Sequence, residues 1–289
     1  MKVLLALSSD QHMNSRQALF PAGVQDDEGI HIDVFKHPVR LALWERWQEF
    51  WGLARARADA YDAKLVALFL GDLGDKNKRD PSGLVFKTPA LQYRVIKAGL
   101  APVVEAAPDL TVMVRGTIVH VGDQGELEEM AAEWLSEKGL YVARDEANNT
   151  WSWWDWAGTL GGVKIHAEHH PKTYGYMPWT EQPGASRESA YISHNCTRTG
   201  MDIPDLAVRG HVHYPADSGM ETIPRVLFTP PWTFTASTYG HRKGFSLAWR
   251  WYGGWFVLCD DGKIDIEPVR WWPERREYWT PDWESVAES

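Results

Sequence analysis

The chain has 289 residues, enough for one large α/β domain or two small ones with a sizeable core. Its 30 Lys and Arg against 39 Asp and Glu give a formal net charge of −9, which argues against a protein that coats a nucleic-acid backbone with a basic face. No apolar run approaches the roughly 20 residues that span a bilayer, and the apolar start over 1–7 is too short for a signal peptide. The two cysteines, Cys196 and Cys259, exclude a disulfide framework or a Cys-rich zinc site. We therefore expect a cytoplasmic protein without a membrane segment.

The first half of the chain alternates between two kinds of pattern. Short apolar runs closed by Ser, Gly or Asp predict buried strands, and apolar residues spaced three and four apart predict amphipathic helices. The predicted elements are, in chain order, a strand over 2–7, a helix over 40–63, a strand over 64–70, a helix over 88–106, a strand over 110–114, a helix over 123–138 and a short strand over 140–143. This alternation is typical of stacked βαβ units and indicates an α/β protein.

The second half becomes richer in strand patterns. It begins with a strand over 163–167, a Gly/Pro-rich loop over 172–184, a helix over 187–197 and a strand over 206–209. Strand patterns then dominate 225–270, with hairpin-type turns at Gly253-Gly254 and at 260–262. Because no repeat or clean linker is visible, we predict one domain over 1–289 whose β-rich, Trp-containing C-terminal part covers about 225–289.

Tryptophan is unusually frequent, with 17 residues. Many occur late in the chain, at Trp232, Trp249, Trp251, Trp255, Trp271, Trp272, Trp279 and Trp283. Packing is the more common use of so bulky a side chain, and we favour it. The alternative is a stacking platform for bases or sugars.

Side chains that can bind a metal follow five of the predicted strands. They are Asp10 and His12, then Asp72 and Asp75, then His120 behind Gly116-Thr117, then His169 and His170, and finally His211 and His213. Ligands of open α/β sheets bind outside the carboxyl ends of the strands, so these groups are expected to converge on one site. Each motif is weak alone, but their joint occurrence after strands is informative. Carboxylates and imidazoles without a thiolate suit two divalent transition metal ions chosen from Mn, Fe, Zn, Co and Ni.

The order of these motifs resembles the calcineurin-like metallophosphoesterase superfamily. The matching series is Asp10-x-His12, Gly71-Asp72-x-x-Asp75, Gly116-Thr117, His169 and Gly210-His211-x-His213. The resemblance spans roughly residues 2–215, and the Thr-Pro-Pro-Trp segment at 229–232 is similar to phage-encoded branches of the family. It implies a four-layer α/β/β/α sandwich and a hydrolase in which a hydroxide bridging two metals attacks a phosphate ester.

The resemblance also implies a role for each side chain. It assigns one metal to Asp10, His12 and His213, the other to His169 and His211, and both to a catalytic, bridging Asp72. We choose His169 over His170 because the family often has its ligand as the first His of His-His-Pro. Asp75 is expected to orient a ligand rather than to bind metal.

The third motif departs from the family pattern. The family has Gly-Asn-His there, with Asn as a metal ligand and His as a proton donor, whereas this chain has Gly116-Thr117-Ile118 and a histidine at His120. A Thr hydroxyl is a poor metal ligand. His120 is therefore either the missing ligand, which we favour, or the displaced proton donor, with a buried histidine of no catalytic role as the alternative.

These residues predict a metal-dependent phosphoesterase with a phosphodiester substrate, such as a nucleotide or a nucleic acid. Diesters are favoured because Arg115 is the only Arg in the matched motifs, and dianionic monoesters usually profit from bidentate Arg clamps. The basic loop over 76–79 is either a phosphate contact or a solvated loop. A phosphomonoesterase or protein phosphatase is one alternative, and a non-catalytic metal-binding scaffold that retains the fold is another. No obligate protein partner is expected.

Overall fold

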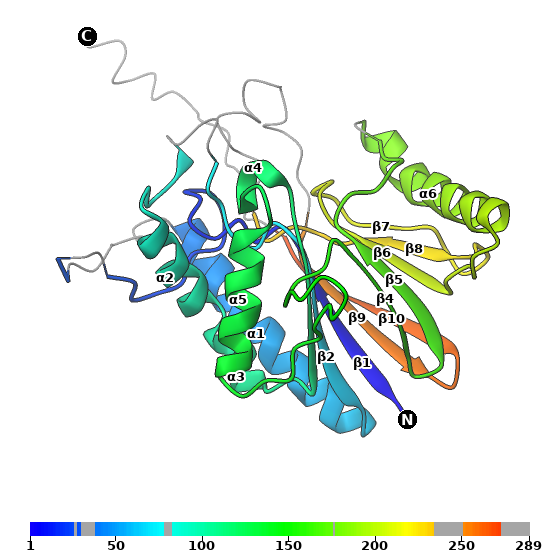
Figure 1. Cartoon of the computed structure of the whole chain (residues 1–289), viewed down its shortest axis with the longest axis horizontal. Coiled ribbons are helices and arrows are strands. Elements are labelled where there is room, and N and C mark those ends of the chain that lie inside the picture. The colour runs from blue at the N-terminus through cyan, green and yellow to red at the C-terminus, as the bar shows by residue number, and fades with distance from the viewer. Residues whose placement is uncertain (26–27, 30–37, 78–82, 176, 234–250, 273–289) are drawn as a thin grey trace, which may run out of the picture.

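Two five-stranded sheets form the centre of the molecule (Figure 1). The computed structural model describes residues 1–25, 28–29, 38–77, 83–175, 177–233 and 251–272. The first sheet has the order β10-β9-β1-β2-β3. Its strands are β1 (Val3–Ser8), β2 (Lys64–Leu70), β3 (Leu110–Val114), β9 (Tyr252–Asp260) and β10 (Lys263–Trp271). β1, β2 and β3 are parallel, and the β9–β10 hairpin extends this sheet antiparallel to β1.

The second sheet has the order β4-β5-β6-β8-β7. Its strands are β4 (Asp155–Leu160), β5 (Val163–Glu168), β6 (Leu206–Arg209), β7 (Ala216–Asp217) and β8 (Arg225–Phe228). The central strands β5, β6 and β8 are parallel, and the edge strands β4 and β7 are antiparallel to their neighbours.

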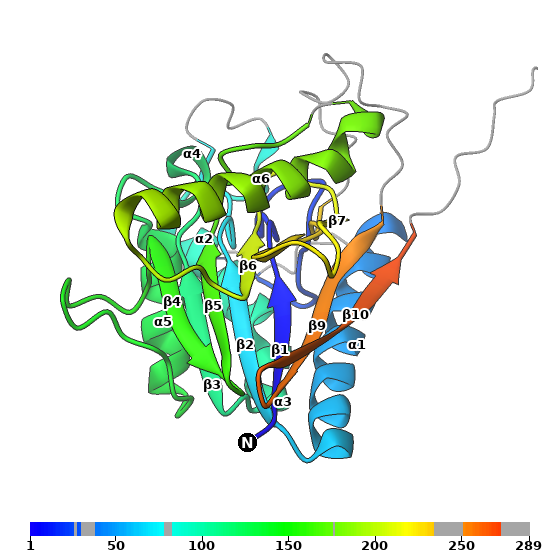
Figure 2. The ribbon, with the colours of Figure 1, turned by 90° about the vertical axis from the view of Figure 1, so that its right-hand side faces the viewer.

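Helices cover the outer face of each sheet (Figure 2). The helices on the first sheet are α1 (Pro38–Tyr61), α2 (Pro89–Gly99), α3 (Ala101–Ala106) and α5 (Glu126–Glu137). The short helix α4 (Ile118–Val121) follows β3, and α6 (Pro178–Thr199) lies on the second sheet. The predicted four-layer α/β/β/α sandwich is therefore confirmed.

The parallel strands β1, β2 and β3 are buried on both faces, which explains their continuous apolar runs. In β1, Leu4 and Ala6 belong to the core beneath the helices, whereas Leu5 and Leu7 belong to the core between the two sheets. A third cluster packs α6 onto the second sheet. β1 is thus packed between two apolar layers, and this packing fixes the position of the residues that follow β1.

Tryptophan packs the layer between α1 and the first sheet. Trp47 and Trp51 of α1 are fully buried together with Trp232. The ring centroids of Trp47 and Trp232 lie 4.8 Å apart in an edge-to-face arrangement, and those of Trp47 and Trp51 lie 5.5 Å apart. Packing is therefore the use of these three residues, while Trp249, Trp279 and Trp283 lie outside the described residues.

Trp47→Ala is expected to destabilise the fold by about 3–5 kcal/mol, because it leaves a large cavity in a buried aromatic cluster. It also removes the hydrogen bond of 2.7 Å from Trp47 Nε1 to the carbonyl of Gly99. Urea unfolding measures the loss, with Trp179→Ala as the control since that side chain is 75% exposed. Equal stability of the two variants would contradict the prediction.

One of the two predicted hairpin turns is wrong. Gly253 and Gly254 form no turn but lie inside β9, opposite Arg270 and Val269. A Cβ on Gly254 would lie 2.3 Å from the carbonyl oxygen of Leu7, so glycine here allows close strand approach. The turn at 260–262 is confirmed as the tip of the β9–β10 hairpin.

The helices and the short strands also differ from the prediction. The single helix over 88–106 is divided into α2 and α3, because Pro102 has no N–H for a continuous ladder. The strand over 140–143 is reduced to one bridge between Thr111 and Val142, and β4 was not predicted. The loop over 172–184 ends early, since α6 begins at Pro178 and tolerates Pro183 in its first turns.

Both cysteines are free and buried. Among the described helices, none combines the length and the apolar character required to cross a membrane.

Candidate metal centre

The structure brings the predicted side chains together beyond the carboxyl ends of β1, β2, β3, β5 and β6. Four groups of three each have ligand atoms within 4.8 Å of one another. They are Asp10, His12 and His213; His12, Asp72 and His120; Asp10, Asp72 and His169; and His169, His170 and His211. Asp10, His12, Asp72 and His169 each belong to two of these groups, so the four groups form one continuous arrangement.

The backbone at this site is unusual. Five candidate ligands have left-handed φ values: Asp10 at 53°, His12 at 43°, Asp72 at 52°, His211 at 68° and His213 at 55°. Such a conformation costs a residue with a side chain about 1–3 kcal/mol and persists only where the surrounding structure imposes it. The tight turns after β1, β2 and β6 therefore aim these side chains at one point.

Glycines allow the turns to touch. A Cβ on Gly116 would lie 2.1 Å from the backbone nitrogen of Asp72, and one on Gly210 would lie 2.1 Å from Ser9 Oγ. A Cβ on Gly71 would lie 2.6 Å from His169 Nδ1. The glycine in each motif is thus required for close approach between neighbouring loops.

The first cluster surrounds the buried carboxylate of Asp10. Its Oδ2 accepts hydrogen bonds from Ser9 Oγ at 2.5 Å and from the backbone nitrogen of His211 at 2.9 Å. Its Oδ1 has no hydrogen-bond partner in the part of the chain that the structure describes, although His213 Nε2 lies 3.1 Å away. Burial alone would raise the pKa of Asp10, but the nearby imidazoles of His213, His12 and His169 together outweigh burial and lower the pKa well below its ordinary value.

The spacing of these atoms suits a cation. His12 Nε2 and His213 Nε2 face each other at 3.2 Å, and both lie beside Asp10 Oδ1. In a tetrahedral site with metal–nitrogen distances of about 2.0–2.1 Å, neighbouring ligand atoms lie about 3.3–3.4 Å apart. Asp10 Oδ1, which is buried and lacks a hydrogen-bond partner among the described residues, lies beside the imidazole nitrogens of His12 and His213. These three atoms therefore suit a divalent metal.

The second cluster consists of three histidines beside the hydroxyl of Thr117. Its Oγ1 lies 3.2 Å from His169 Nε2, 3.3 Å from His170 Nε2 and 3.3 Å from His211 Nδ1. His169 is buried, with Nε2 3.2 Å from Asp72 Oδ2 and Nδ1 2.5 Å from the carbonyl oxygen of Leu70. That second contact fixes the ring so that Nε2 points into the cluster.

His120 lies on the side of the first cluster. Its Nδ1 lies 3.0 Å from Asp75 Oδ1, and its ring stands edge-on to His12 with centroids 4.5 Å apart. Burial would lower the pKa of His120, but the hydrogen bond with Asp75 and the charges of Asp72, Asp75 and Asp10 together outweigh burial and raise the pKa. His120 therefore groups with His12 and Asp72. Thr117 instead faces His169, His170 and His211.

Sequence reasoning ranks His169 above His170 and misses one residue on α5. His170 was set aside in favour of His169, yet both rings reach Thr117, and only the His-His-Pro sequence signalled this. Glu128 was missed because it lies on α5, outside the metal-binding motifs. It is fully buried beneath the second motif, where its Oε1 accepts a hydrogen bond of 3.1 Å from the backbone nitrogen of Leu73.

Glu128→Gln is expected to remove a pH dependence of stability. Burial and the charge of Asp72 raise the pKa of Glu128 to about 8, from an ordinary value of 4.5. The folded protein therefore holds this proton more tightly than the unfolded chain, and its contribution to stability is lost as pH rises from about 4.5 to about 8. Each pKa unit corresponds to about 1.4 kcal/mol.

The measurement is thermal unfolding of chelator-treated protein at pH 5 and pH 8. Glu128→Gln should lose less stability than the parent chain between these values, by at least about 1.4 kcal/mol. Glu133→Gln, an exposed change on the same helix, should follow the parent chain. Parallel pH profiles for all three proteins would show that Glu128 is not protonated in the fold.

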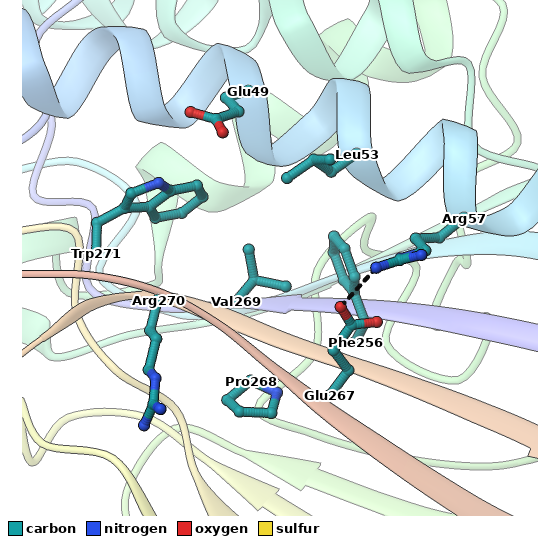
Figure 3. Close-up of a pocket in the computed structure, with 9 residues that line it drawn as sticks. All are labelled: Glu49, Leu53, Arg57, Phe256, Glu267, Pro268, Val269, Arg270 and Trp271. Carbon is teal, nitrogen blue, oxygen red and sulfur yellow. Dashed lines mark hydrogen bonds and ion pairs between the residues drawn. The ribbon is translucent and has the colours of Figure 1, made fainter.

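A cavity of about 230 Å³ lies elsewhere, between α1 and β10 (Figure 3). An ion pair of 2.9 Å between Arg57 and Glu267 crosses it. The lining residues are Glu49, Leu53, Arg57, Phe256, Glu267, Pro268, Val269, Arg270 and Trp271. None of them is a candidate metal ligand, so this cavity is separate from the site above.

No protein-family model and no curated protein matches the chain. Matching solved structures include a predicted phosphoesterase from Streptococcus pneumoniae, with 12% identity and a TM-score of 0.34 over 92% of this chain and 88% of that one. Vacuolar protein sorting 29 from Cryptosporidium parvum has 13% identity and a TM-score of 0.38, over 94% and 100% of the two chains. Sulfate thiohydrolase SoxB from Thermus thermophilus has 11% identity and a TM-score of 0.37, over 92% and 55%. The likeness to calcineurin-like metallophosphoesterases rests on the motif order and the four layers of this chain itself.

Proposed function

We propose that this protein is a dinuclear, metal-dependent phosphoesterase that prefers phosphodiesters. The observation that carries the proposal is the position of Asp72 between two clusters of imidazoles. Its Oδ2 lies 3.2 Å from His169 Nε2 and 3.9 Å from His12 Nε2. One carboxylate in contact with both clusters is what a bridging ligand requires.

The donor atoms present fit two divalent transition metals. Asp10, His12 and His213 would hold the first, His169 and His211 the second, and Asp72 both. When bound, such a pair polarises a phosphoryl oxygen and makes a water acidic enough to act as a nucleophile near neutral pH. Mixed nitrogen and oxygen donors without sulfur suit Mn, Fe, Zn, Co or Ni.

The protein's own residues prepare the rest of the reaction. The backbone nitrogen of Thr117 donates to Asp72 Oδ1 at 2.5 Å and fixes that carboxylate. His120, held by Asp75, is placed beside the site and would donate a proton to the leaving oxygen. Of the two roles that the sequence leaves open for His120, we favour the proton donor, because His120 lies beside His12 of the first cluster, whereas the ligand missing from the family pattern belongs to the second metal.

The position of Arg115 supports a diester substrate. Its Nε donates to Ser152 Oγ at 2.8 Å, and a terminal nitrogen lies 3.4 Å from Glu129. The buried guanidinium is therefore committed to Glu129 and Ser152 and does not serve as a clamp for a dianionic monoester. Lys76 of the basic loop lies 3.4 Å from Glu126, and residues 78–79 of that loop lie outside the described residues.

The test is a substrate panel on the Mn-loaded protein. We expect a higher kcat/KM for a bis-aryl phosphate than for an aryl phosphate, and loss of both activities in chelator. Nucleotide diesters and single- and double-stranded DNA then narrow the substrate class. Clear monoester preference at neutral pH would contradict the diester assignment. Metal binding without turnover of any ester would instead support a non-catalytic scaffold. Thr117 is the residue that favours this alternative, because the family has a metal ligand at its position.

A further inference from the structure

His170 occupies a place that the assigned roles do not explain. It follows His169 directly at the end of β5 and is half-buried. Its ring centroid lies 4.4 Å from that of His211 and 4.6 Å from that of His169. An imidazole in contact with two candidate ligand rings of one metal is itself within reach of that metal.

The three histidine nitrogens surround one point. His169 Nε2, His170 Nε2 and His211 Nδ1 all lie 3.2–3.3 Å from Thr117 Oγ1. One ring nitrogen of each histidine lies within 4.8 Å of the others. The distances to Thr117 Oγ1 are close to the about 3.3–3.4 Å between neighbouring ligand atoms of a tetrahedral site with bonds of about 2.0–2.1 Å. The arrangement is therefore that of a ligand shell, with Thr117 at its edge.

Thr117 stands where the resemblance places the Asn ligand of the second metal. Its hydroxyl is neutral and binds metals poorly, so the second metal needs one more donor. His170 Nε2 is 3.3 Å from that hydroxyl and thus reaches the space beside the lost amide. A neutral imidazole is a far better ligand than a hydroxyl for a transition metal.

We propose that His170 is a direct ligand of the second metal and replaces the motif Asn that Thr117 has displaced. This inference rests on the proposed dinuclear centre. It gives the second metal one carboxylate, Asp72, and three imidazoles, His169, His170 and His211. Because imidazole suits Zn, Fe, Co and Ni while amide and carboxylate oxygens suit Mn and Mg, the exchange shifts the second site towards nitrogen-preferring metals.

The experiment is a titration of metal-free protein with Co²⁺ and Zn²⁺, followed by cobalt absorption and by metal analysis after dialysis. The parent chain should bind two equivalents. His170→Ala should keep the first and bind the second at least about tenfold more weakly, since even the loss of a group that only orients a ligand costs about 10–100-fold. His194→Ala, which removes an exposed imidazole from α6, should bind like the parent chain.

The proposed replacement of the family Asn by His170 can be reversed by mutation. Adding Thr117→Asn to His170→Ala restores the ligand type of the family and should recover most of the second-site affinity. Unchanged affinity for two metals in His170→Ala overturns the proposal. If the double variant binds only one metal ion, the claim that His170 replaces the family Asn at the position of Thr117 is overturned.

A structural readout covers the case in which the variants fail to fold. In crystals of the zinc-loaded parent chain, the second zinc should lie about 2.0–2.1 Å from His170 Nε2. A zinc bound by His169 and His211 but not by His170 overturns the inference and leaves the dinuclear centre intact. A parent chain that binds fewer than two metals instead contradicts the proposed function, so the two failures are distinguishable.

Discussion

Asp72→Asn should be the most damaging single substitution in the chain, with turnover reduced at least about a hundredfold. Two metals stabilise charge in the transition state by several kcal/mol, and each 1.36 kcal/mol corresponds to about a factor of ten in rate. Asp72 is buried and touches both imidazole clusters. Burial would raise the pKa of Asp72, but the imidazoles of His169, His12 and His120 together outweigh burial and lower the pKa, so the side chain is an anion in the fold. Asn keeps the shape and removes that charge from both metals.

The measurements are metal content after dialysis and turnover of a bis-aryl phosphate. Asp202→Asn is the matched control, because it removes an exposed carboxylate that pairs only with Lys164 at the surface in the described structure. The control should keep two metals and normal turnover. If Asp72→Asn protein also keeps both metals and near-normal turnover, the assignment of the site is wrong.

The layers of the fold were predictable because burial leaves a direct trace in the sequence. The strands β1, β2 and β3 are continuous apolar runs, since they lie between a helix layer and a second sheet. Their ends are marked by Ser, Gly and Asp, which indicated where polar side chains would gather. The single domain over 1–289, by contrast, stays a prediction.

Features that depend on contacts distant in sequence were not predictable. Gly253 and Gly254 carry a turn-like pattern, but pairing with β10 on one side and close approach to β1 on the other hold them in a strand. Within the site, the order of motifs indicated that the histidines converge. It did not indicate which histidine meets which, because ring orientation depends on contacts such as His169 with the carbonyl of Leu70 and His120 with Asp75.

His120→Ala should separate two classes of phosphodiester. If His120 protonates the leaving oxygen, esters with alkoxide leaving groups should lose about 10²–10⁴-fold in kcat. Esters of nitrophenol, whose leaving group needs no proton, should be little affected. Both metals should remain bound, because His120 Nδ1 is engaged with Asp75 on the side of His12. The measurements are kcat for both ester classes and metal content.

Asp75→Asn provides the matched control through pH. Asp75 raises the pKa of His120, so His120 stays protonated to a higher pH in the parent chain than it would alone. A proton donor acts only while protonated, and turnover of alkyl esters should therefore fall as pH rises through this pKa. Asp75→Asn should move that fall to lower pH and leave the nitrophenyl ester unchanged. A different result, in which His120→Ala loses one metal and regains activity at high added metal, would identify His120 as a ligand. Unchanged metal content and unchanged turnover of both ester classes would leave His120 as a half-buried histidine held in place by Asp75 and without a catalytic role.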